Sequence, residues 1–154
     1  MKISQGVEWG LHCATLLALA PPDRVVRRDR LAAHYGLPEA YLAKHLQAMA
    51  RAGVLHAVPG PRGGYRLGRE AARITVLDVV EAVEGSTPPF LCQEIRQRGT
   101  GALPPDQCRR PCAIHATMTA ADQAWRASLR TVTIADLVAR LPAGVRERNE
   151  KIVS

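Results

Sequence analysis

The stretch that most restricts the possible folds of this chain is "VRRDRLAAHYGLPEAYLAKHLQAMARAGVL", followed directly by "HAVPGPRGGYRLGR". Its first part predicts a short helix over 28–35 that ends at Gly36, and a longer helix over 38–52 that begins with a proline. Its second part predicts a β-hairpin, because short apolar runs at 54–58 and 65–67 flank a loop of glycine and proline. This order of elements is typical of a helix-turn-helix with a wing.

Two further helical patterns flank this motif. Apolar residues at helical spacing predict an amphipathic helix over 2–20, which two prolines end. After the hairpin, "ITVLDVVEAVEG" predicts a helix with Thr75 as its N-cap and Gly85 as its stop. The N-terminal half of the chain is therefore mostly helical.

The C-terminal half begins with an irregular segment. Prolines, glycines and polar turn residues fill 86–111, a connection long enough to be either functional or disordered. Helical spacing returns over 113–132, and a long helix there would suit dimerisation. Thr133 predicts the cap of a short helix over 134–141, and the tail at 144–154 is expected to fray.

The charge balance favours an anionic partner. The chain has 21 Lys and Arg against 14 Asp and Glu, a formal charge of +7, and most of its basic residues are arginines. Arginine binds phosphates and guanine edges through two hydrogen bonds, which indicates nucleic acid, although a solvated basic surface has the same composition. The sequence contains no nucleophile–base pair, P-loop or dinucleotide fingerprint, so we do not expect an enzyme.

The N-terminal segment does not predict export or membrane insertion. Glu8 and His12 interrupt the apolar stretch that a signal peptide needs. No apolar run reaches the ~18 residues that span a bilayer. We therefore expect a cytoplasmic protein, whose cysteines bind metal or do redox work more often than they form disulfides.

The helix-turn-helix and the wing supply candidate DNA contacts. A recognition helix reads base edges from its N-terminal turns, and basic groups nearby bind phosphates. An arginine at a hairpin tip can enter a minor groove, and a neighbouring glycine lets the backbone approach closely. The candidate DNA-binding residues are Arg27, Arg28, Glu39, Ala40, Tyr41, Lys44, Arg62 and Gly63. Taken one at a time, Tyr41 could be a core residue and Lys44 only a solvated charge. The order of helix, turn, helix and basic hairpin in a positively charged chain favours DNA binding.

Four potential soft metal ligands lie in or beside the irregular segment. They are Cys92, Cys108, Cys112 and His115, the last three within "DQCRRPCAIH". Iron–sulphur clusters prefer thiolates, with histidine as an occasional replacement, whereas structural zinc takes four cysteines or histidines. Taken alone, this set suits zinc at least as well as it suits a cluster.

Two more candidates lie on the first predicted helix, in "VEWGLHC". Glu8 and His12 are four residues apart and share one side of the helix, at a spacing that can chelate a metal. A surface Glu–His pair has the same spacing, so the residues alone leave both interpretations open. Cys13 points elsewhere on the helix and is expected to be a buried thiol.

The run from "LAAHYGLPEAYLAKHLQAMARAGVLHAVPGPRGGYRLGR" through "ITVLDVVEAVEG" resembles the Rrf2 family of bacterial winged-helix regulators. The resemblance covers nearly the whole chain, and "GPRGGYRL" is its most specific part. It implies a homodimer on a partly palindromic operator, a long helix crossing the dimer, and an iron–sulphur cluster in the cysteine loop. Ala43 replaces the glutamate with which some family members read DNA, and Pro59 replaces an arginine often found at the start of the wing, with Arg62 three residues on, so the operator sequence does not transfer from relatives.

The family's usual cluster site has three closely spaced cysteines, whereas Cys92 here lies far from the other two. NsrR-type members, which this chain resembles, use an acidic residue at the position of Glu8 to reach a cluster across the dimer interface. RsrR-type members are similar in pairing a glutamate and a histidine with two cysteines of the other subunit. The resemblance therefore implies a 2Fe–2S cluster shared between subunits. Its implied ligands are Glu8, His12, Cys108 and Cys112, with Cys92 and His115 in reserve.

Trp9 stands directly between Glu8 and Gly10, where a large ring beside a ligand could act as a lever. The hypothesis is that reduction alters the ligand contacts, Trp9 repacks, and the two recognition helices of the dimer change their spacing. Ordinary packing at the interface is the alternative role for this ring.

These expectations describe a redox-sensing transcriptional regulator, acting as a repressor, with a mainly α fold and a small β wing. Its expected parts are a winged helix-turn-helix domain at 1–85, a cluster-binding loop at 86–112, a dimerisation helix at 113–132, and a C-terminal helix and tail at 133–154. One alternative is a zinc-stabilised or cofactor-free winged-helix regulator. Another is a small iron–sulphur redox or assembly protein that binds no DNA.

Overall fold

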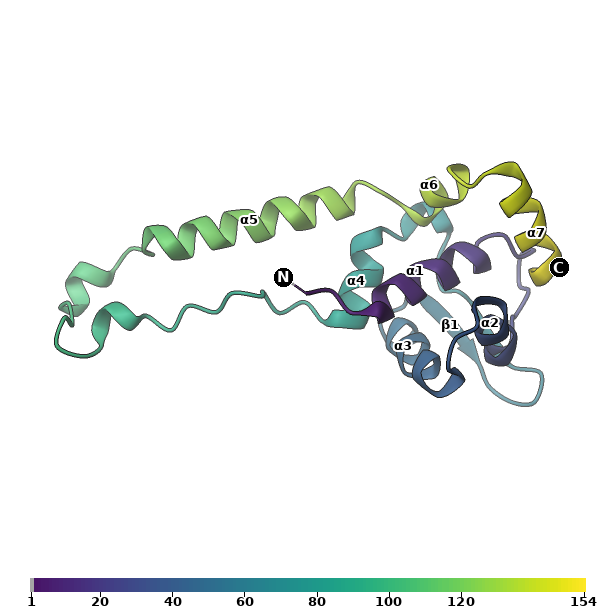
Figure 1. Ribbon diagram of the computed structural model, residues 1–154, viewed down its shortest axis with the longest axis horizontal. Helices are drawn as coiled ribbons and strands as arrows, with labels where there is room; N and C mark the ends of the chain where they lie inside the picture. The colour runs from purple at the N-terminus through teal and green to yellow at the C-terminus, as the bar shows by residue number, and fades with distance from the viewer. Residues whose placement is uncertain (1) are drawn as a thin grey trace. The chain divides into compact units, whose positions relative to one another are not determined.

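The computed structural model describes residues 2–154, which divide into two compact units (Figure 1). One unit contains residues 2–86 and 129–154, and the other contains 87–128. The first holds α1 (Gln5–Leu17), α2 (Arg28–Tyr35), α3 (Glu39–Arg51), β1 (Leu55–Val58), β2 (Gly64–Leu67), η1 (Ala71–Arg73), α4 (Val76–Glu84), α6 (Ile134–Ala139) and α7 (Ala143–Val153). The fold is mainly α with a small antiparallel hairpin, as predicted.

Helices α2 and α3 form the predicted helix-turn-helix. Helix α2 ends at Gly36, whose φ of 63° is the left-handed conformation that glycine adopts at little cost. The Leu37 N–H then donates to the Ala32 carbonyl at 2.9 Å and closes the turn. The residues that α3 buries recur at helical spacing: Leu42, Leu46 and Met49. One face of α3 is therefore in the core, and the opposite face is open to solvent.

The wing is an antiparallel hairpin fixed to the start of the helix-turn-helix. Strands β1 and β2 pair in a register that sets Leu55 opposite Leu67. Just before α2, Val26 exchanges two backbone hydrogen bonds with Tyr65, each 2.9 Å long. The side chains of Val26 and Tyr65 are both buried. This short third segment couples the position of the wing to that of α2.

A capping box begins each of the two helices α4 and α6. Thr75 accepts a hydrogen bond from the Asp78 N–H, and the Asp78 carboxylate accepts one from the Thr75 N–H. Thr133 and Asp136 repeat the arrangement at the start of α6. The two caps are neighbours, since Thr75 and Thr133 form an antiparallel β-bridge. Ile134, next to Thr133, is fully buried. Residues 129–154 therefore pack into the core of the first unit.

The C-terminal tail does not fray, so that prediction is wrong. Residues Ala143–Val153 form α7, and Val153 is only 1% exposed. The Arg24 Nη2 donates to the Ser154 carbonyl at 2.8 Å. Figure 1 shows α7 beside α1, which it contacts. The polar sequence of this segment conceals the helix because packing against α1, rather than local propensity, stabilises it.

Four predicted helices are shorter in the structure: α3 loses one residue at each end, α5 ends at Arg130 rather than at 132, and α1 and α6 are shortened as well. Helix α1 spans Gln5–Leu17 rather than 2–20, and its end tightens: Leu19 and Ala20 donate to carbonyls three residues back. Helix α6 ends at Ala139 rather than at 141.

The second unit consists of a loop and most of one long helix. Two 3₁₀ turns, η2 (Ile95–Gln97) and η3 (Pro105–Cys108), interrupt the irregular segment. Helix α5 (Ala113–Arg130) has 18 residues, of which none is buried. Within residues 2–154, neither α5 nor any other helix has the length and apolarity needed to cross a bilayer.

Candidate nucleic-acid interface and cysteine loop

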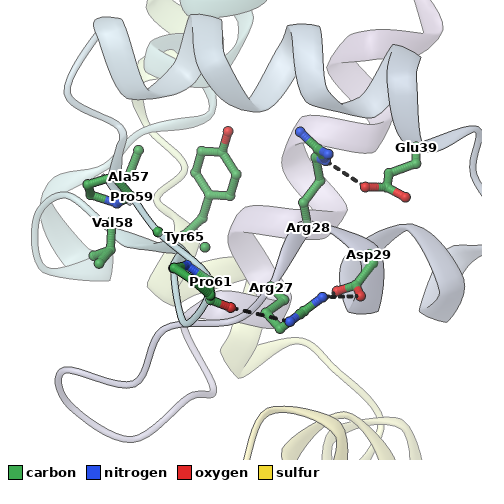
Figure 2. Close-up of a pocket in the computed structure, with 12 residues that line it drawn as sticks. Arg27, Arg28, Asp29, Glu39, Ala57, Val58, Pro59, Pro61 and Tyr65 are labelled. Carbon is green, nitrogen blue, oxygen red and sulfur yellow. Dashed lines mark hydrogen bonds and ion pairs between the residues drawn. The ribbon is translucent and has the colours of Figure 1, made fainter.

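A groove of about 790 Å³ lies between the start of the helix-turn-helix and the wing (Figure 2). The beginnings of α2 and α3 form one side, and the hairpin forms the other. Four of the predicted DNA contacts line it: Arg27, Arg28, Glu39 and Gly63. The fold thus brings residues from three separate stretches of sequence to one surface.

Arg28 and Glu39 connect the two helices across this groove. The Arg28 Nε lies 2.8 Å from the Glu39 Oε1, as the dashed line in Figure 2 marks. Their side chains are 44% and 47% exposed. Exposed ion pairs contribute only about 0–1 kcal/mol to stability. The main effect of this pair is therefore to orient the guanidinium.

Arg27 is held from two sides. Its Nη2 and Nε donate to the Asp29 carboxylate at 2.8 and 3.1 Å, and its Nη1 donates to the Pro61 carbonyl in the wing at 3.4 Å (Figure 2). The hydrogen bond from Arg27 holds the pKa of Asp29 below its ordinary value, and the same bond raises the pKa of the guanidinium. Arg27 thus connects α2 to the wing.

The wing loop brings Arg62 to the tip of the hairpin, where it is exposed. The Gly63 N–H donates to the Gly60 carbonyl at 2.9 Å and closes the loop. A Cβ on Gly63 would lie 2.0 Å from the Val58 carbonyl oxygen, so no other residue fits there without moving the backbone.

The first turns of α3 present the remaining predicted contacts. Ala40 and Lys44 are exposed, and Tyr41 is 68% exposed. The alternative of Tyr41 as a core residue is therefore wrong. Ala43 is half-buried.

Glu8 and His12 are both exposed on α1, beside a hollow of about 420 Å³. The rings of His12 and Tyr35 have centroids 5.4 Å apart, and the Tyr35 hydroxyl donates to the His12 carbonyl at 3.1 Å. Burial raises the pKa of Tyr35, which keeps this donor protonated. Cys13 is fully buried, and burial raises the pKa of its thiol to about 12, as expected of an unreactive cysteine.

Helix α1 meets the recognition helix α3 at Gly6. A Cβ there would lie 2.3 Å from Cε1 of His45, so glycine is needed to leave room for the ring; we call this the Gly6–His45 contact. Trp9 packs against the same ring edge-to-face, with centroids 5.8 Å apart. One turn on, a Cβ on Gly10 would lie 3.0 Å from the Met49 Sδ. The sequence analysis does not predict this close approach of α1 to α3. The four-residue spacing of Gly6 and Gly10 is the sequence feature that could have indicated it.

Arg96 organises the cysteine loop. Its Nη2 donates to the Glu94 carboxylate at 2.7 Å and to the Arg110 carbonyl at 3.1 Å. The hydrogen bond with Glu94 raises the pKa of Arg96, and the nearby thiols of Cys108 and Cys112 raise it further. One guanidinium therefore connects the start of the loop to the segment that carries both cysteines. No motif in the sequence marks this residue.

His115 contacts Cys112 through its backbone. Its backbone nitrogen lies 3.5 Å from the Cys112 Sγ, and its Nδ1 is buried without a hydrogen-bond partner among residues 2–154. A buried ring nitrogen without a hydrogen-bond partner in residues 2–154, three positions after Cys112, is compatible with a nitrogen–sulphur donor set, whether for zinc or for a cluster. Cys92 is exposed. Glu8 and His12 belong to the other unit, and among residues 2–154 no three His, Cys, Asp or Glu side chains converge on a metal position.

Comparison with known proteins identifies one family. The family model described as "Rrf2: Iron-dependent Transcriptional regulator" matches residues 3–140. Protein aau3 of Rhizobium meliloti (strain 1021) is 34% identical over 132 residues, which are 86% of this chain and 79% of the relative.

Two solved structures share the fold. CymR, the global cysteine regulator of B. subtilis, aligns with a TM-score of 0.70 at 24% identity, over 92% of this chain and 99% of that one. IscR of T. potens aligns with a TM-score of 0.65 at 23% identity, over 96% of each chain. At these identities the two structures support the fold alone.

Proposed function

The chain belongs to the Rrf2 family of transcriptional regulators, and from this premise we propose that it is a redox-sensing repressor controlled by an iron–sulphur cluster. Operator affinity would change with the state of a 2Fe–2S cluster held across a homodimer interface. The observation that carries the proposal is that α1 bears two exposed candidate ligands and also contacts the recognition helix. Members of the family are transcriptional regulators, not enzymes.

The winged helix-turn-helix makes the protein a DNA-binding regulator, and its groove supports a specific mode of contact. Arg27 and Arg28 flank the groove, Tyr41 and Lys44 project from the first turns of α3, and Arg62 extends from the wing. This is the distribution expected when a helix reads the major groove and a hairpin reaches the adjacent minor groove. The formal charge of +7 favours association with the phosphate backbone.

The proposed cluster ligands are Cys108 and Cys112 of one subunit and Glu8 and His12 of the partner subunit. Each pair is separated by four residues, and exposure of the pair on α1 leaves it accessible to a second subunit. Arg96 holds the loop around the two thiols before any cluster binds. A bound 2Fe–2S cluster would supply a one-electron change in charge at the interface.

A change at the ligands would reach DNA through α1. Glu8 adjoins Trp9, whose ring packs on His45 of the recognition helix. We expect Trp9→Ala to keep the cluster but to weaken the dependence of operator affinity on redox state. A binding assay on the oxidised and reduced variant measures this, and an undiminished redox response would rule out Trp9 as the link.

The long helix supports a homodimer. On α5, Ile114 and Met118 lie one turn apart, and they are 68% and 41% exposed. Large apolar side chains exposed on one helix face mark a surface that another protein covers. A second copy of the chain is the partner that the proposal assigns to this face.

A zinc-stabilised regulator is the second candidate. The buried Nδ1 of His115, which has no hydrogen-bond partner in residues 2–154 and belongs to the residue three positions after Cys112, favours it, since zinc accepts mixed cysteine and histidine ligands. Such a site would make the loop a structural element without redox control.

Metal analysis separates the two candidates. Anaerobically purified protein should contain about two irons and two sulphides per chain and show a visible spectrum that dithionite bleaches. Cys108→Ser should lose the iron, and Cys92→Ser should keep it. Colourless protein with about one zinc per chain would contradict the redox proposal and favour the second candidate.

A further inference from the structure

Two adjacent arginines at the edge of the groove have different hydrogen-bonding partners. All three nitrogens of Arg27 donate to protein oxygens, two to Asp29 and one to Pro61. Within residues 2–154, the Arg28 side chain makes one hydrogen bond, from Nε to Glu39. A guanidinium has five N–H donors. Both terminal nitrogens of Arg28 thus remain available to an incoming ligand.

The geometry points to a division of roles, and it rests on the proposed DNA-binding function: Arg28 is the phosphate-binding arginine of the groove, and Arg27 is a brace that positions the wing. Glu39 is a positioning residue for Arg28 and does not read a base. The sequence alone predicts direct DNA contacts for all three.

The charge environment supports this division. Asp29 contacts Arg27 through both carboxylate oxygens, so the positive charge of Arg27 is offset by a partner that presents two acceptors. Glu39 engages only the Nε edge of Arg28. The opposite edge of the same guanidinium keeps two parallel N–H groups, the arrangement that binds a phosphate through two hydrogen bonds.

The position of Arg27 fits a brace. Its contact with the Pro61 carbonyl lies next to Arg62, the exposed residue at the wing tip. The backbone bonds between Val26 and Tyr65 already fix strand β2 of the wing. Arg27 adds a second attachment nearer the tip, and so controls where Arg62 can reach.

Glu39 is poorly suited to direct base recognition. A carboxylate accepts hydrogen bonds only, and on DNA it would have to accept from a cytosine amino group. Its Oε1 already accepts from Arg28. Its place in the first turn of α3 is favourable for a negative charge through the helix dipole. A negatively charged acceptor held at this helix N-terminus is well suited to orienting the Arg28 guanidinium.

Charge-matched double variants test the division on a mixed-sequence DNA duplex. The logarithm of the binding constant falls with the logarithm of salt concentration by about 0.9 per phosphate contact. Arg28→Gln/Glu39→Gln should lower the slope by about 1 and the affinity roughly tenfold. Arg27→Gln/Asp29→Asn should lower affinity while leaving the slope unchanged. Arg146→Gln/Glu150→Gln removes a comparable exposed pair on α7, outside the groove, and should change neither.

Glu39 is tested separately with variants that lose the same charge. Glu39→Gln keeps an oxygen that accepts from Arg28, and should bind the duplex more tightly than Glu39→Ala. In an Arg28→Gln background this difference should vanish. A difference that persists without Arg28 would overturn the positioning role.

Two results would overturn the division of roles or its premise. Equal loss of slope in the Arg27 and Arg28 pair variants would show that both arginines bind phosphate. Wild-type protein that binds duplex with no salt dependence would instead overturn the proposed DNA-binding function. In that case the failure would appear in the wild type and not in the comparison of variants.

Discussion

Replacing Gly6 with alanine tests the contact between α1 and the recognition helix. The added Cβ would lie 2.3, 2.6 and 2.7 Å from three atoms of the His45 ring, where carbon atoms normally approach to about 3.5–4.0 Å. The whole ring must therefore move by about 1 Å or more relative to α1. Trp9 packs against that ring, so it has little room to turn away.

The expected magnitude follows from two opposing effects. Overpacking a well-filled site costs about 1–3 kcal/mol. Alanine offsets up to about 1 kcal/mol of this, because it is the better helix former. The middle of the range gives a net loss of about 1 kcal/mol in the free energy of unfolding. Displacement of His45 on α3 should also weaken duplex binding.

The assays are urea unfolding and duplex titration, with Gly144→Ala as the control. Gly144 is on α7 and has no atom within 4 Å of an added Cβ, so alanine there should be neutral or stabilising. His45→Ala in the Gly6→Ala background should recover much of the loss, because the obstructing ring is gone. A Gly6→Ala variant as stable as wild type, or one that His45→Ala does not relieve, would refute the reasoning.

Three further predictions concern the loop, the cysteines and a helix cap. Arg96→Ala should lower the iron bound per chain by releasing the loop around its thiols, whereas Arg98→Ala, an exposed neighbour, should not; iron analysis of both variants decides it. Alkylation followed by mass spectrometry should modify the exposed Cys92 in the folded protein and leave the buried Cys13 intact, and rapid modification of Cys13 would contradict its burial. The Asp136 carboxylate accepts hydrogen bonds from the backbone N–H and then from the side chain of Thr133, and these bonds hold its pKa below the usual value. Ionised Asp136 therefore stabilises the folded state above about pH 4, and this stabilisation is lost as the pH falls through the depressed pKa. Asp136→Asn should flatten the acid limb of a stability–pH curve, and an unchanged limb would argue against the cap.

Local sequence patterns predict the helix-turn-helix well because its determinants lie within a few residues of one another. Gly36 must adopt a left-handed conformation, and Leu42 and Leu46 mark the buried face of α3 by spacing alone. Thr75 and Thr133 are likewise recognisable as caps from the acidic residue three positions later. Each of these signals can be read within one short stretch of the sequence.

Features that depend on distant partners escape such prediction. Helix α7 has a polar sequence, and only the packing of residues such as Val153 reveals why it is helical. Arg27 and Arg28 are neighbours of the same type; Asp29 lies close to both in sequence, but Pro61 and Glu39, which also distinguish them, lie more than ten residues away along the chain. The Gly6–His45 contact joins residues from two helices in the same way.

The most direct test of redox control is operator affinity measured on one anaerobic preparation in three states: oxidised, reduced with dithionite, and stripped of metal. The operator is first isolated by selecting bound duplexes from a random-sequence pool. The proposal predicts that affinity changes tenfold or more, about 1.4 kcal/mol, between at least two of these states, and that the change disappears in His12→Ala. Equal affinity in all three states would contradict cluster control and leave a winged-helix regulator that does not sense redox state.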